Sequence, residues 1–567
     1  MTHPIGLFRA ALTSGLAILA LSSGMAFAAD SEQPKDRLPG LVAALHDVDP
    51  VRRITATESM ARMGSQWQVI VPELSNALSD PNPDVRIAAA RALERISSEA
   101  QAAAPALIDA LKDDNAGVRW AVAGALGAFS AKSASVAPAL IEVLHDPDDD
   151  VRLAAADSVI RMGLDAVDPL VETLSDSDPL VRAAATGALG GIGALARRSV
   201  PALAKRLGDE DPRVREAAAT AIGAIASDTT LSDDIDWAQQ FATHPIFPRA
   251  VRTAGRAAQR EEAKRIAARL TVTALIETVS DTDPKVRLAA IMALGRIGPD
   301  SAEAVPALES ALFAFEPQER RAAAAAIGRI GPRAAEAAFS LADLLGDDDR
   351  DVRWTAARAL ARLEQPGTDA LVEGIESGDT LIRQAALLGL EIIGPSGTSA
   401  IPALVALLDD SDSSTERRSA ARALGSIGPD AAPAIPALSR MATAPDSLVR
   451  VAAIDALAAI GGSDSVPALV AALRDDDQAV RRSAANALER ISVPPSYVPQ
   501  MITALTDADT NVRRSAAYVL RNMGPGAAPA ASALEGALDD ENREVRHAAA
   551  WALQTLTPRN GANHAEN

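Results

Sequence analysis

One phrase, Asp80 to Ile96, recurs along nearly the whole chain and restricts the fold more than any other feature. It reads as an acidic turn followed by a helix whose apolar residues, from Val85 to Ile96, fall on one face at a period of 3.6 residues. The arginine after the valine returns about every 30 to 37 residues. The copies are Arg52, Arg86, Arg119, Arg152, Arg182, Arg215, Arg287, Arg320, Arg353, Arg383, Arg417, Arg450, Arg481, Arg513 and Arg546, with Arg252 as a degraded copy. Such a period predicts an array of structural repeats.

Each repeat is predicted to contain two helices. The first opens with a small apolar residue and proline, as at Ala104-Pro105, because the missing N–H of proline costs nothing in a first helical turn. The second carries the recurring arginine and often ends in glycine and proline, as at Gly298-Pro299, which is typical of a helix C-cap followed by a stop. No segment has the two-residue alternation of a strand, so the fold class is all-α.

Aspartate lies six residues before the arginine in most repeats, at Asp80, Asp113, Asp146, Asp176, Asp209, Asp281, Asp347, Asp475, Asp507 and Asp540. On these residues, roughly Leu41 to Thr557, the chain resembles the HEAT-repeat family, and most of all its short bacterial form named after phycobilisome lyases. The resemblance implies a right-handed α-solenoid of armadillo type with about 15–16 helix pairs. It also implies a hydrogen-bonded ladder in which these aspartates join arginines of successive repeats. We expect a weaker ladder where His46, Ala314, Ser377, Ser411 and Ala444 replace the aspartate.

The spacing of the repeated phrase divides the chain into six predicted segments. These are a leader (1–28), a loose segment (29–40), N-terminal repeats (41–227), a degenerate repeat with a basic helix (228–270), C-terminal repeats (271–557) and a disordered tail (558–567). The array is expected to divide at 228–270. That segment is either a degraded repeat with a solvated face or a hinge or docking site for an acidic partner.

The leader resembles a bacterial secretory signal peptide. Arg9 is its only fixed side-chain charge, Ala10 to Leu21 is a short apolar run, and Ala26 and Ala28 are small residues before a cleavage site. An uncleaved anchor is the alternative, although the run is short for a bilayer. We expect cleavage after Ala28, export to the periplasm or the extracellular space, and no membrane span afterwards.

The sequence lacks the residues that several functional classes require. A net charge of -20 argues against binding nucleic acid. The absence of cysteine excludes disulfides and thiolate chemistry. No His-Glu-x-x-His helix, phosphate-binding loop or Gly-x-Ser-x-Gly turn occurs. Acidic runs such as Asp146 to Asp150 could suggest calcium, but they lack the glycine and distal glutamate of an EF-hand and favour helix N-caps. We therefore expect no catalytic, metal or cofactor site.

The second helices are expected, from the resemblance, to line a concave face. Two, six and nine residues after the valine, side chains point away from the apolar face. These positions give the candidate partner-binding residues Arg482, Arg514, Tyr518, Arg521, His547 and Trp551 near the C-terminus, and Trp120 and Leu153 earlier, with small Gly187 and Gly190 beside them. Arginine and aromatic residues are enriched at binding hot spots. The alternatives are packing between repeats for Trp120 and Trp354, a cap over the last repeat for Trp551, and pairing with neighbouring acids for Arg514 and Arg521.

The sequence thus favours an exported, non-catalytic scaffold that binds a protein or acidic peptide partner along the solenoid. One alternative is a chaperone or lyase that handles a cofactor, as the phycobilisome lyases do. The other is a structural envelope protein that binds itself or polysaccharide. The oligomeric state stays open.

Overall fold

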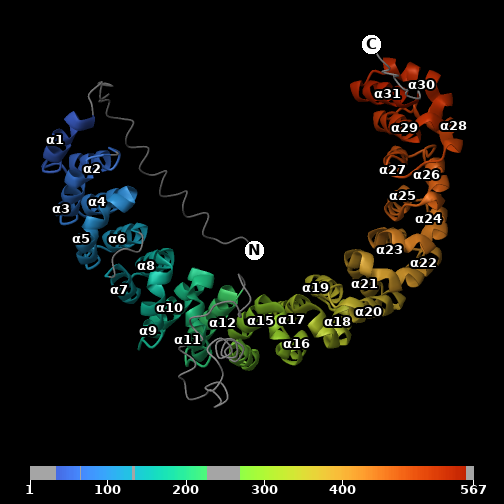
Figure 1. Ribbon diagram of the computed structural model, residues 1–567. Helices are drawn as coiled ribbons and strands as arrows, with labels where there is room; N and C mark the ends of the chain where they lie inside the picture. Colours follow the sequence, from blue (N-terminus) through green and yellow to red (C-terminus); the bar gives the residue numbers. More distant parts are fainter. Residues whose placement is uncertain (1–33, 64, 130–134, 227–267, 557–567) are drawn as a thin grey trace, which may run out of the picture. The chain divides into compact units, whose positions relative to one another are not determined.

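The computed structural model describes residues 34–63, 65–129, 135–226 and 268–556 (Figure 1). All regular structure within these ranges is helical, which confirms the all-α fold class. The predicted leader 1–28, the tail 558–567 and nearly all of 228–270 lie outside the described residues. The chain forms two compact units, Met1–Pro169 and Leu170–Asn567, and each is described by itself.

Each unit is built from helix pairs. The first helices are α1 (Pro34–Ala44), α3 (Trp67–Ala77), α5 (Ala104–Ala110), α7 (Val136–Glu142), α9 (Leu164–Thr173), α11 (Val200–Arg206), the helical residues 268–278, α16 (Val305–Leu312), α18 (Ala338–Asp343), α20 (Glu364–Glu376), α22 (Ile401–Asp410), α24 (Ile435–Met441), α26 (Val466–Ala472), α28 (Val498–Ala504) and α30 (Ala531–Gly536). Fifteen second helices lie in the described ranges: α2 (Pro50–Met60), α4 (Pro83–Ile96), α6 (Ala116–Ala128), α8 (Asp149–Met162), α10 (Pro179–Ile192), α12 (Pro212–Ala226), α15 (Pro284–Ile297), α17 (Pro317–Ile330), α19 (Arg350–Leu360), α21 (Thr380–Ile393), α23 (Ser414–Ile427), α25 (Ser447–Ile460), α27 (Gln478–Leu488), α29 (Thr510–Met523) and α31 (Arg543–Leu556).

Helix α4 shows why this sequence folds locally as it does. The side chain of Asn82 caps the helix by accepting a hydrogen bond of 2.8 Å from the amide of Asp84, and Pro83 occupies the first turn. The predicted apolar face, from Val85 to Ile96, is buried. Because a lone helix pair cannot cover such a face, each pair must pack on its neighbours.

The repeats are joined by short 3-10 helices that the sequence did not predict. After α15, Gly298 adopts a φ of +70° and ends the helix, a conformation that favours glycine. The 3-10 helix η7 (Gly298–Ala304) follows and leads into α16. The other 3-10 helices between repeats are η3 (Ser97–Ala103), η5 (Gly193–Ser199), η8 (Gly331–Ala337), η10 (Gly394–Ala400), η11 (Gly428–Ala434), η12 (Ser463–Ser465), η13 (Pro495–Tyr497) and η14 (Gly524–Ala530). Three more lie between the two helices of one repeat: η4 (Val143–His145), η9 (Leu344–Gly346) and η15 (Ala537–Asp539).

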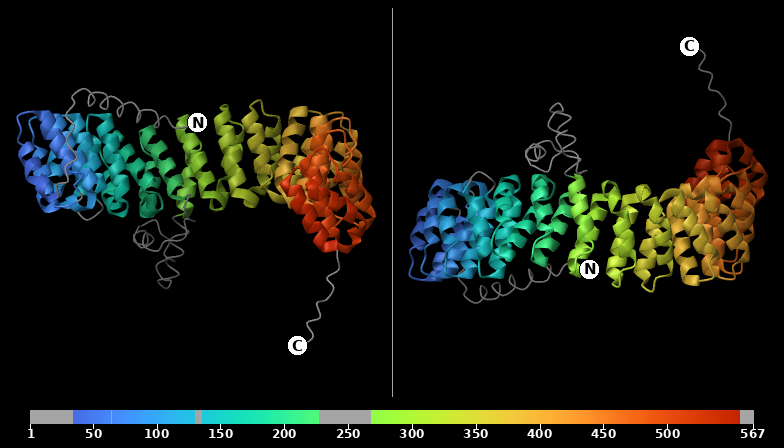
Figure 2. Two further views of the ribbon diagram at one scale, coloured as in Figure 1. Left: turned by 90° about the horizontal axis from the view of Figure 1, so that it is seen from above. Right: turned by 90° about the horizontal axis from the view of Figure 1, so that it is seen from below.

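In unit 2 the second helices form one layer and the first helices the other, with the second-helix layer on the inner side (Figure 1). Helices of successive repeats stand side by side (Figure 2). Small residues bring neighbouring second helices close together. A Cβ atom on Gly328 would lie 2.9 Å from the Cα of Ala359. A glycine approaches the Cα of an alanine on the next second helix in the same way in four other pairs: Gly190 and Ala221, Gly223 and Ala293, Gly295 and Ala326, and Gly425 and Ala456. Gly190 is therefore an interhelical contact, whereas the expected wall residue Gly187 is exposed with open space beside it.

The sequence predicted that the array divides at 228–270. The structure shows no division there. Helices α12 and α15 flank that segment and pack directly on each other. A Cβ on Gly223 would lie 2.9 Å from the Cα of Ala293, about the same Cβ-to-Cα distance as at the glycine contacts between other successive second helices. The boundary between the two compact units instead falls within α9.

One further expectation needs correction, and another is not decided by the structure. Helix α1 starts at Pro34, so part of the segment expected to be loose is helical. Two stretches, Pro179–Arg206 and Thr380–Asp410, are long and apolar enough by composition to span a membrane, although none was expected. Each is interrupted by a glycine with positive φ, Gly193 or Gly394, and by a 3-10 helix, so neither is one continuous α-helix.

Candidate functional site

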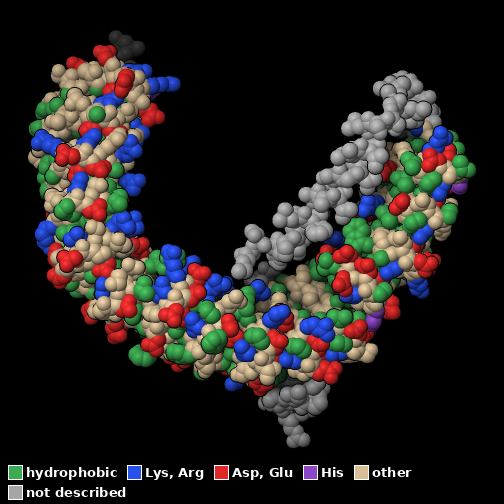
Figure 3. Space-filling model, turned by 180° about the vertical axis from the view of Figure 1, so that it is seen from behind, with side chains coloured by type: hydrophobic (Ala, Val, Ile, Leu, Met, Phe, Trp, Pro, Cys, Tyr) green, Lys and Arg blue, Asp and Glu red, His purple; other side chains and the backbone are tan. Residues whose placement is uncertain are grey.

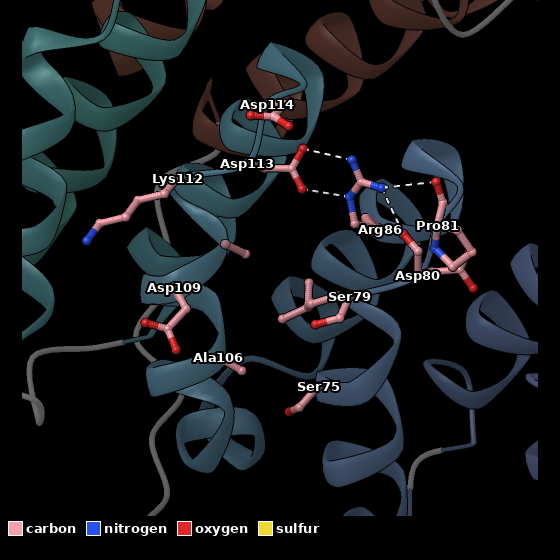
Figure 4. Close-up of a pocket in the computed structure, with 12 residues that line it drawn as sticks. Ser75, Ser79, Asp80, Pro81, Arg86, Ala106, Asp109, Lys112, Asp113 and Asp114 are labelled. Carbon is pink, nitrogen blue, oxygen red and sulfur yellow. Dashed lines mark hydrogen bonds and ion pairs between the residues drawn. The ribbon is translucent and has the colours of Figure 1, made fainter.

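An arginine–carboxylate ladder links successive repeats at the turn between their two helices. Arg86 donates from Nε to Asp113 Oδ2 at 2.6 Å and from Nη2 to Asp113 Oδ1 at 2.8 Å (Figure 4). Its Nη1 donates to the backbone oxygen of Asp80, six residues earlier, at 2.8 Å. Asp113 Oδ1 also accepts the amide hydrogen of Asn115. One guanidinium thus donates hydrogen bonds to the turn of its own repeat and to the turn of the next repeat.

The same rung recurs in both units, with shortest N···O distances of 2.6 to 2.9 Å. In unit 1 the pairs are Arg53–Asp80, Arg86–Asp113 and Arg119–Asp146. In unit 2 they are Arg182–Asp209, Arg215–Asp281, Arg320–Asp347, Arg450–Asp475, Arg481–Asp507 and Arg513–Asp540. Arg152 instead pairs with Asp149 of its own helix. Arg546, in the last second helix, donates to the backbone oxygens of Asp540 and Glu541, while Asp176 accepts the amide hydrogen of Asp178.

The first repeat is one residue out of the predicted register. Arg53, not Arg52, forms the rung with Asp80, and Asp47, not His46, lies six residues before it. Arg53 is the fourth residue of α2, as Arg86 is of α4. The Val-Arg pair at Arg52 misled the alignment because it imitates the recurring phrase one position early.

At two of the substituted positions, a buried glutamate replaces the missing aspartate. Arg287 pairs with Glu319 at 2.6 Å, and Arg383 pairs with Glu416 at 3.0 Å. Both glutamates occupy the valine position of the following second helix and are only 5% and 3% exposed. The expected weakening at Ala314 and Ser411 is therefore wrong. In the sequence, the replacement was visible as a glutamate in place of valine directly before the recurring arginine, in the pairs Glu319-Arg320 and Glu416-Arg417.

Two rungs in the described part of unit 2 are open, as expected for Ser377 and Ala444. Arg353 donates only to the backbone oxygens of Asp347 and Asp348. The Nε of Arg417 is shielded from solvent and has no hydrogen-bond partner. The residue at the carboxylate position for Arg417 is Ala444, which is 8% exposed.

Restoring the second of these rungs should stabilise the protein. Ala444→Asp would place a carboxylate opposite Arg417, and a hydrogen bond to a charged partner contributes about 1–2 kcal/mol. Calorimetric melting of the full chain is expected to show a higher Tm. Ala442→Asp, at another buried position of the same turn, faces no rung arginine and should lower the Tm. A lower Tm for Ala444→Asp would contradict the ladder geometry.

The rung carboxylate of Asp113 has a lowered pKa. Burial of Asp113 would by itself raise its pKa, but the hydrogen bonds from Arg86 and from the Asn115 amide outweigh burial and hold the pKa below its ordinary value. The hydrogen bond with Asp113 raises the pKa of Arg86 in turn. An open cavity of about 560 Å³ lies beside this rung, with Lys112 and Asp109 among its lining residues (Figure 4).

The acidic runs serve as caps and rungs. Asp146 completes the Arg119 rung, and Asp148 caps α8 by accepting the amides of Asp150 and Val151. Within the described ranges, no three His, Asp or Glu side chains are grouped as metal ligands.

The predicted C-terminal residues lie on α27, α29 and α31, and three of them form one cluster. The Arg521 guanidinium carbon lies 3.8 Å from the ring centre of Trp551, a cation–π distance. Tyr518 meets Trp551 edge-on at 6.3 Å between ring centres. Half of the Trp551 surface remains exposed, so the residue is only partly a cap over the last repeat.

Two other predicted arginines of this face are partly neutralised by carboxylates; for Arg514 this agrees with the alternative interpretation, whereas Arg521 stacks on Trp551. Arg514 pairs with Glu544 at 3.0 Å, and Arg482 pairs with the buried carboxylate of Asp509 at 2.7 Å. Arg514, Tyr518 and His547 line an open pocket of about 520 Å³. Its other lining residues, Glu489, Arg543 and Glu544, were not predicted. Arg543 and Glu544 lie on α31 and Glu489 is the C-cap of α27, so extending the same helical faces by one turn would have found them.

In unit 1, Trp120 on α6 and Leu153 on α8 are exposed, by 43% and 61%. The guanidinium of Arg91 on α4 lies 5.8 Å from the Trp120 ring centre. Packing between repeats therefore covers Trp120 only in part.

Stacked helix pairs and a ladder between their turns define an all-α solenoid. The family model for HEAT repeats matches residues 38–115, 71–161, 167–258, 247–326, 305–391, 340–425, 401–489 and 466–554. The chain therefore belongs to the HEAT-repeat family.

Solved structures share this fold at low identity. Importin beta crystallised in a polyethylene glycol condition is 14% identical with a TM-score of 0.53, and the match covers 92% of this chain and 82% of importin beta. Importin beta in an ammonium sulfate condition is 15% identical with a TM-score of 0.48, over 98% and 81% of the two chains. Kap121p is 14% identical with a TM-score of 0.47, over 95% and 66%. A comparison with curated proteins finds no match.

Proposed function

We propose that this HEAT-repeat protein is a non-catalytic scaffold that binds a protein partner on the second-helix face of α27, α29 and α31. The observation that carries the proposal is the Tyr518–Arg521–Trp551 cluster, in which a cation and two aromatic rings remain accessible on a preformed surface. Such side chains supply most of the binding energy at protein interfaces.

The pocket beside this cluster supports a peptide partner. Its lining carries both positive and negative charges, from Arg514 and Arg543 and from Glu489 and Glu544. A peptide segment offers apolar, donor and acceptor groups together, and it would meet the aromatic rings and the mixed charges at once. We also propose that the protein works outside the cytoplasm, which the leader-like residues before Ala29 support.

Charge reversal on this face should abolish partner capture. Arg514→Glu with Arg521→Glu removes the Arg521–Trp551 contact and places like charges beside Glu544. In a pull-down from envelope extract, the double variant should lose proteins that the parent chain retains. Arg333→Glu with Arg440→Glu, which alters two exposed arginines on η8 and α24, changes the net charge equally and should retain them. An unchanged set of partners in the first variant would refute the site.

A further inference from the structure

A second cationic surface lies on α15, α17 and α19, away from the C-terminal cluster on α29 and α31. Arg296, Arg321, Arg329 and Arg358 are exposed on these helices, and Arg362 is exposed two residues after α19 ends; we call these five residues the central arginine patch. In Figure 3, Lys and Arg side chains gather along the inner edge of this part of unit 2. A surface of one sign is unexpected on a protein with a net charge of -20.

Carboxylates are nearly absent from these three helices. Glu319 is buried and held by Arg287. Asp351 is the one exposed carboxylate on these helices, and it pairs with Arg321 at 3.4 Å. The neighbouring second helices carry acids again, with Glu216 on α12 and Glu391 on α21. The patch is therefore limited to three repeats.

Helix stability explains only part of the patch. Arg296, Arg329 and Arg358 lie in the last turns of α15, α17 and α19, where a cation interacts favourably with the helix dipole. Arg321 lies near the start of α17, and Arg350 is the first residue of α19. The helix dipole does not favour a cation at these positions; Arg321 pairs with Asp351 and Arg350 stacks on Trp354.

Apolar side chains are interleaved with the charges. Met292 and Trp354 are each 41% exposed on α15 and α19. Arg350 stacks on Trp354 with its guanidinium carbon 3.8 Å from the ring centre. A partner that meets both kinds of group must carry negative charges and apolar side chains, which favours a peptide over a phosphate backbone.

The repeat geometry sets the spacing of the charges on such a partner. Arg296, Arg329 and Arg362 occupy the same position in successive repeats, and packed helices are about 9–10 Å apart. An extended chain advances about 3.3 Å per residue. Three residues of extended chain therefore match one repeat.

We propose that the central arginine patch binds an acidic protein segment in extended conformation, with carboxylates at about every third residue and apolar residues between them. This proposal rests on the scaffold function proposed above, and it adds a second site with a defined partner chemistry. The segment lies across α15, α17 and α19, and its apolar side chains contact Met292 and Trp354.

The test uses the full chain and a fluorescein-labelled peptide of about twelve residues, with glutamate at every third position and leucine and serine between. Fluorescence anisotropy is expected to show that Arg329→Glu with Arg358→Glu weakens binding at least about tenfold. Arg333→Glu with Arg440→Glu, the matched control, should change it less than about twofold. A peptide with glutamine in place of glutamate should not bind. Melting curves check that the variants remain folded, and Arg329→Gln with Arg358→Gln should give an intermediate loss.

Several results would overturn the proposal. The first is a patch variant that binds the peptide as tightly as the parent chain does. The second is a control variant that loses as much affinity as the patch variant. The third is an oligonucleotide or a sulfated polysaccharide that binds as tightly as the acidic peptide. Self-association that the patch variant abolishes would assign the patch to a second copy instead. Arg514→Glu with Arg521→Glu should bind this peptide like the parent chain, so failure here is distinguishable from failure of the C-terminal site.

Discussion

Replacing Gly328 with valine is expected to destabilise unit 2 by about 3 kcal/mol, one of the two largest effects we predict. The Cβ of the new residue would lie 2.9 Å from the Cα of Ala359 and 3.0 Å from its Cβ. Because the first of these atoms belongs to the backbone, the strain can be relieved only by separating α17 from α19. Urea unfolding followed by circular dichroism measures the loss.

Gly328→Ala and Gly187→Ala separate packing from helix propensity. Alanine favours a helix over glycine by about 1 kcal/mol, so propensity alone predicts that both variants gain stability. Gly187 has open space around it and should gain, whereas Gly328→Ala should lose. A gain at both positions would show that the two helices do not need their close approach.

Asp209→Ala should cost about 3 kcal/mol, because it leaves the Arg182 guanidinium buried without its carboxylate. Their side chains are 7% and 4% exposed, the most buried aspartate rung in the described ranges. Thermal unfolding at pH 7 measures the effect. Glu210 also contacts Arg182, at 3.5 Å, but it is 87% exposed. Glu210→Ala should therefore change stability by less than about 0.5 kcal/mol.

The effect of Asp209→Ala should fade in acid. Burial would raise the pKa of Asp209, but the hydrogen bonds from Arg182 and from the Asp211 amide outweigh burial and lower it. A carboxylate with a lowered pKa contributes stability that is full above its unfolded pKa of about 3.9 and is lost as the pH falls through the folded value. The parent and the variant should thus converge below about pH 4. A difference that stays constant from pH 7 to pH 3 would assign the loss to packing rather than to charge.

The sequence was sufficient to predict the helix pairs and the all-α class. The period of the arginines and the apolar face from Val85 to Ile96 are local features, and local features determine where these helices start and end. The C-terminal cluster was predictable for the same reason, since Tyr518 and Arg521 share a face of one helix and Trp551 occupies the matching face of the next repeat.

Contacts between repeats were harder to predict, because they depend on which residue of the next repeat can reach across. Glu319 and Glu416 occupy a position expected to be apolar, so nothing in their own helices marks them as rung carboxylates. The register error at Arg53 has a similar origin, since Val51 and Arg52 match the repeated phrase locally. The central arginine patch was missed because its residues belong to three helices and form a group only when those helices stand side by side.

The rung between Arg215 and Asp281 joins residues 66 positions apart, whereas most aspartate rungs span 27. The placement of a repeat is therefore decided by the surfaces that meet and not by the length of the peptide that connects them. In evolutionary terms, the junction between one second helix and the following first helix is a point where new sequence can be acquired while the older repeats keep their mutual register. A family built in this way can gain appended functions without redesigning its framework.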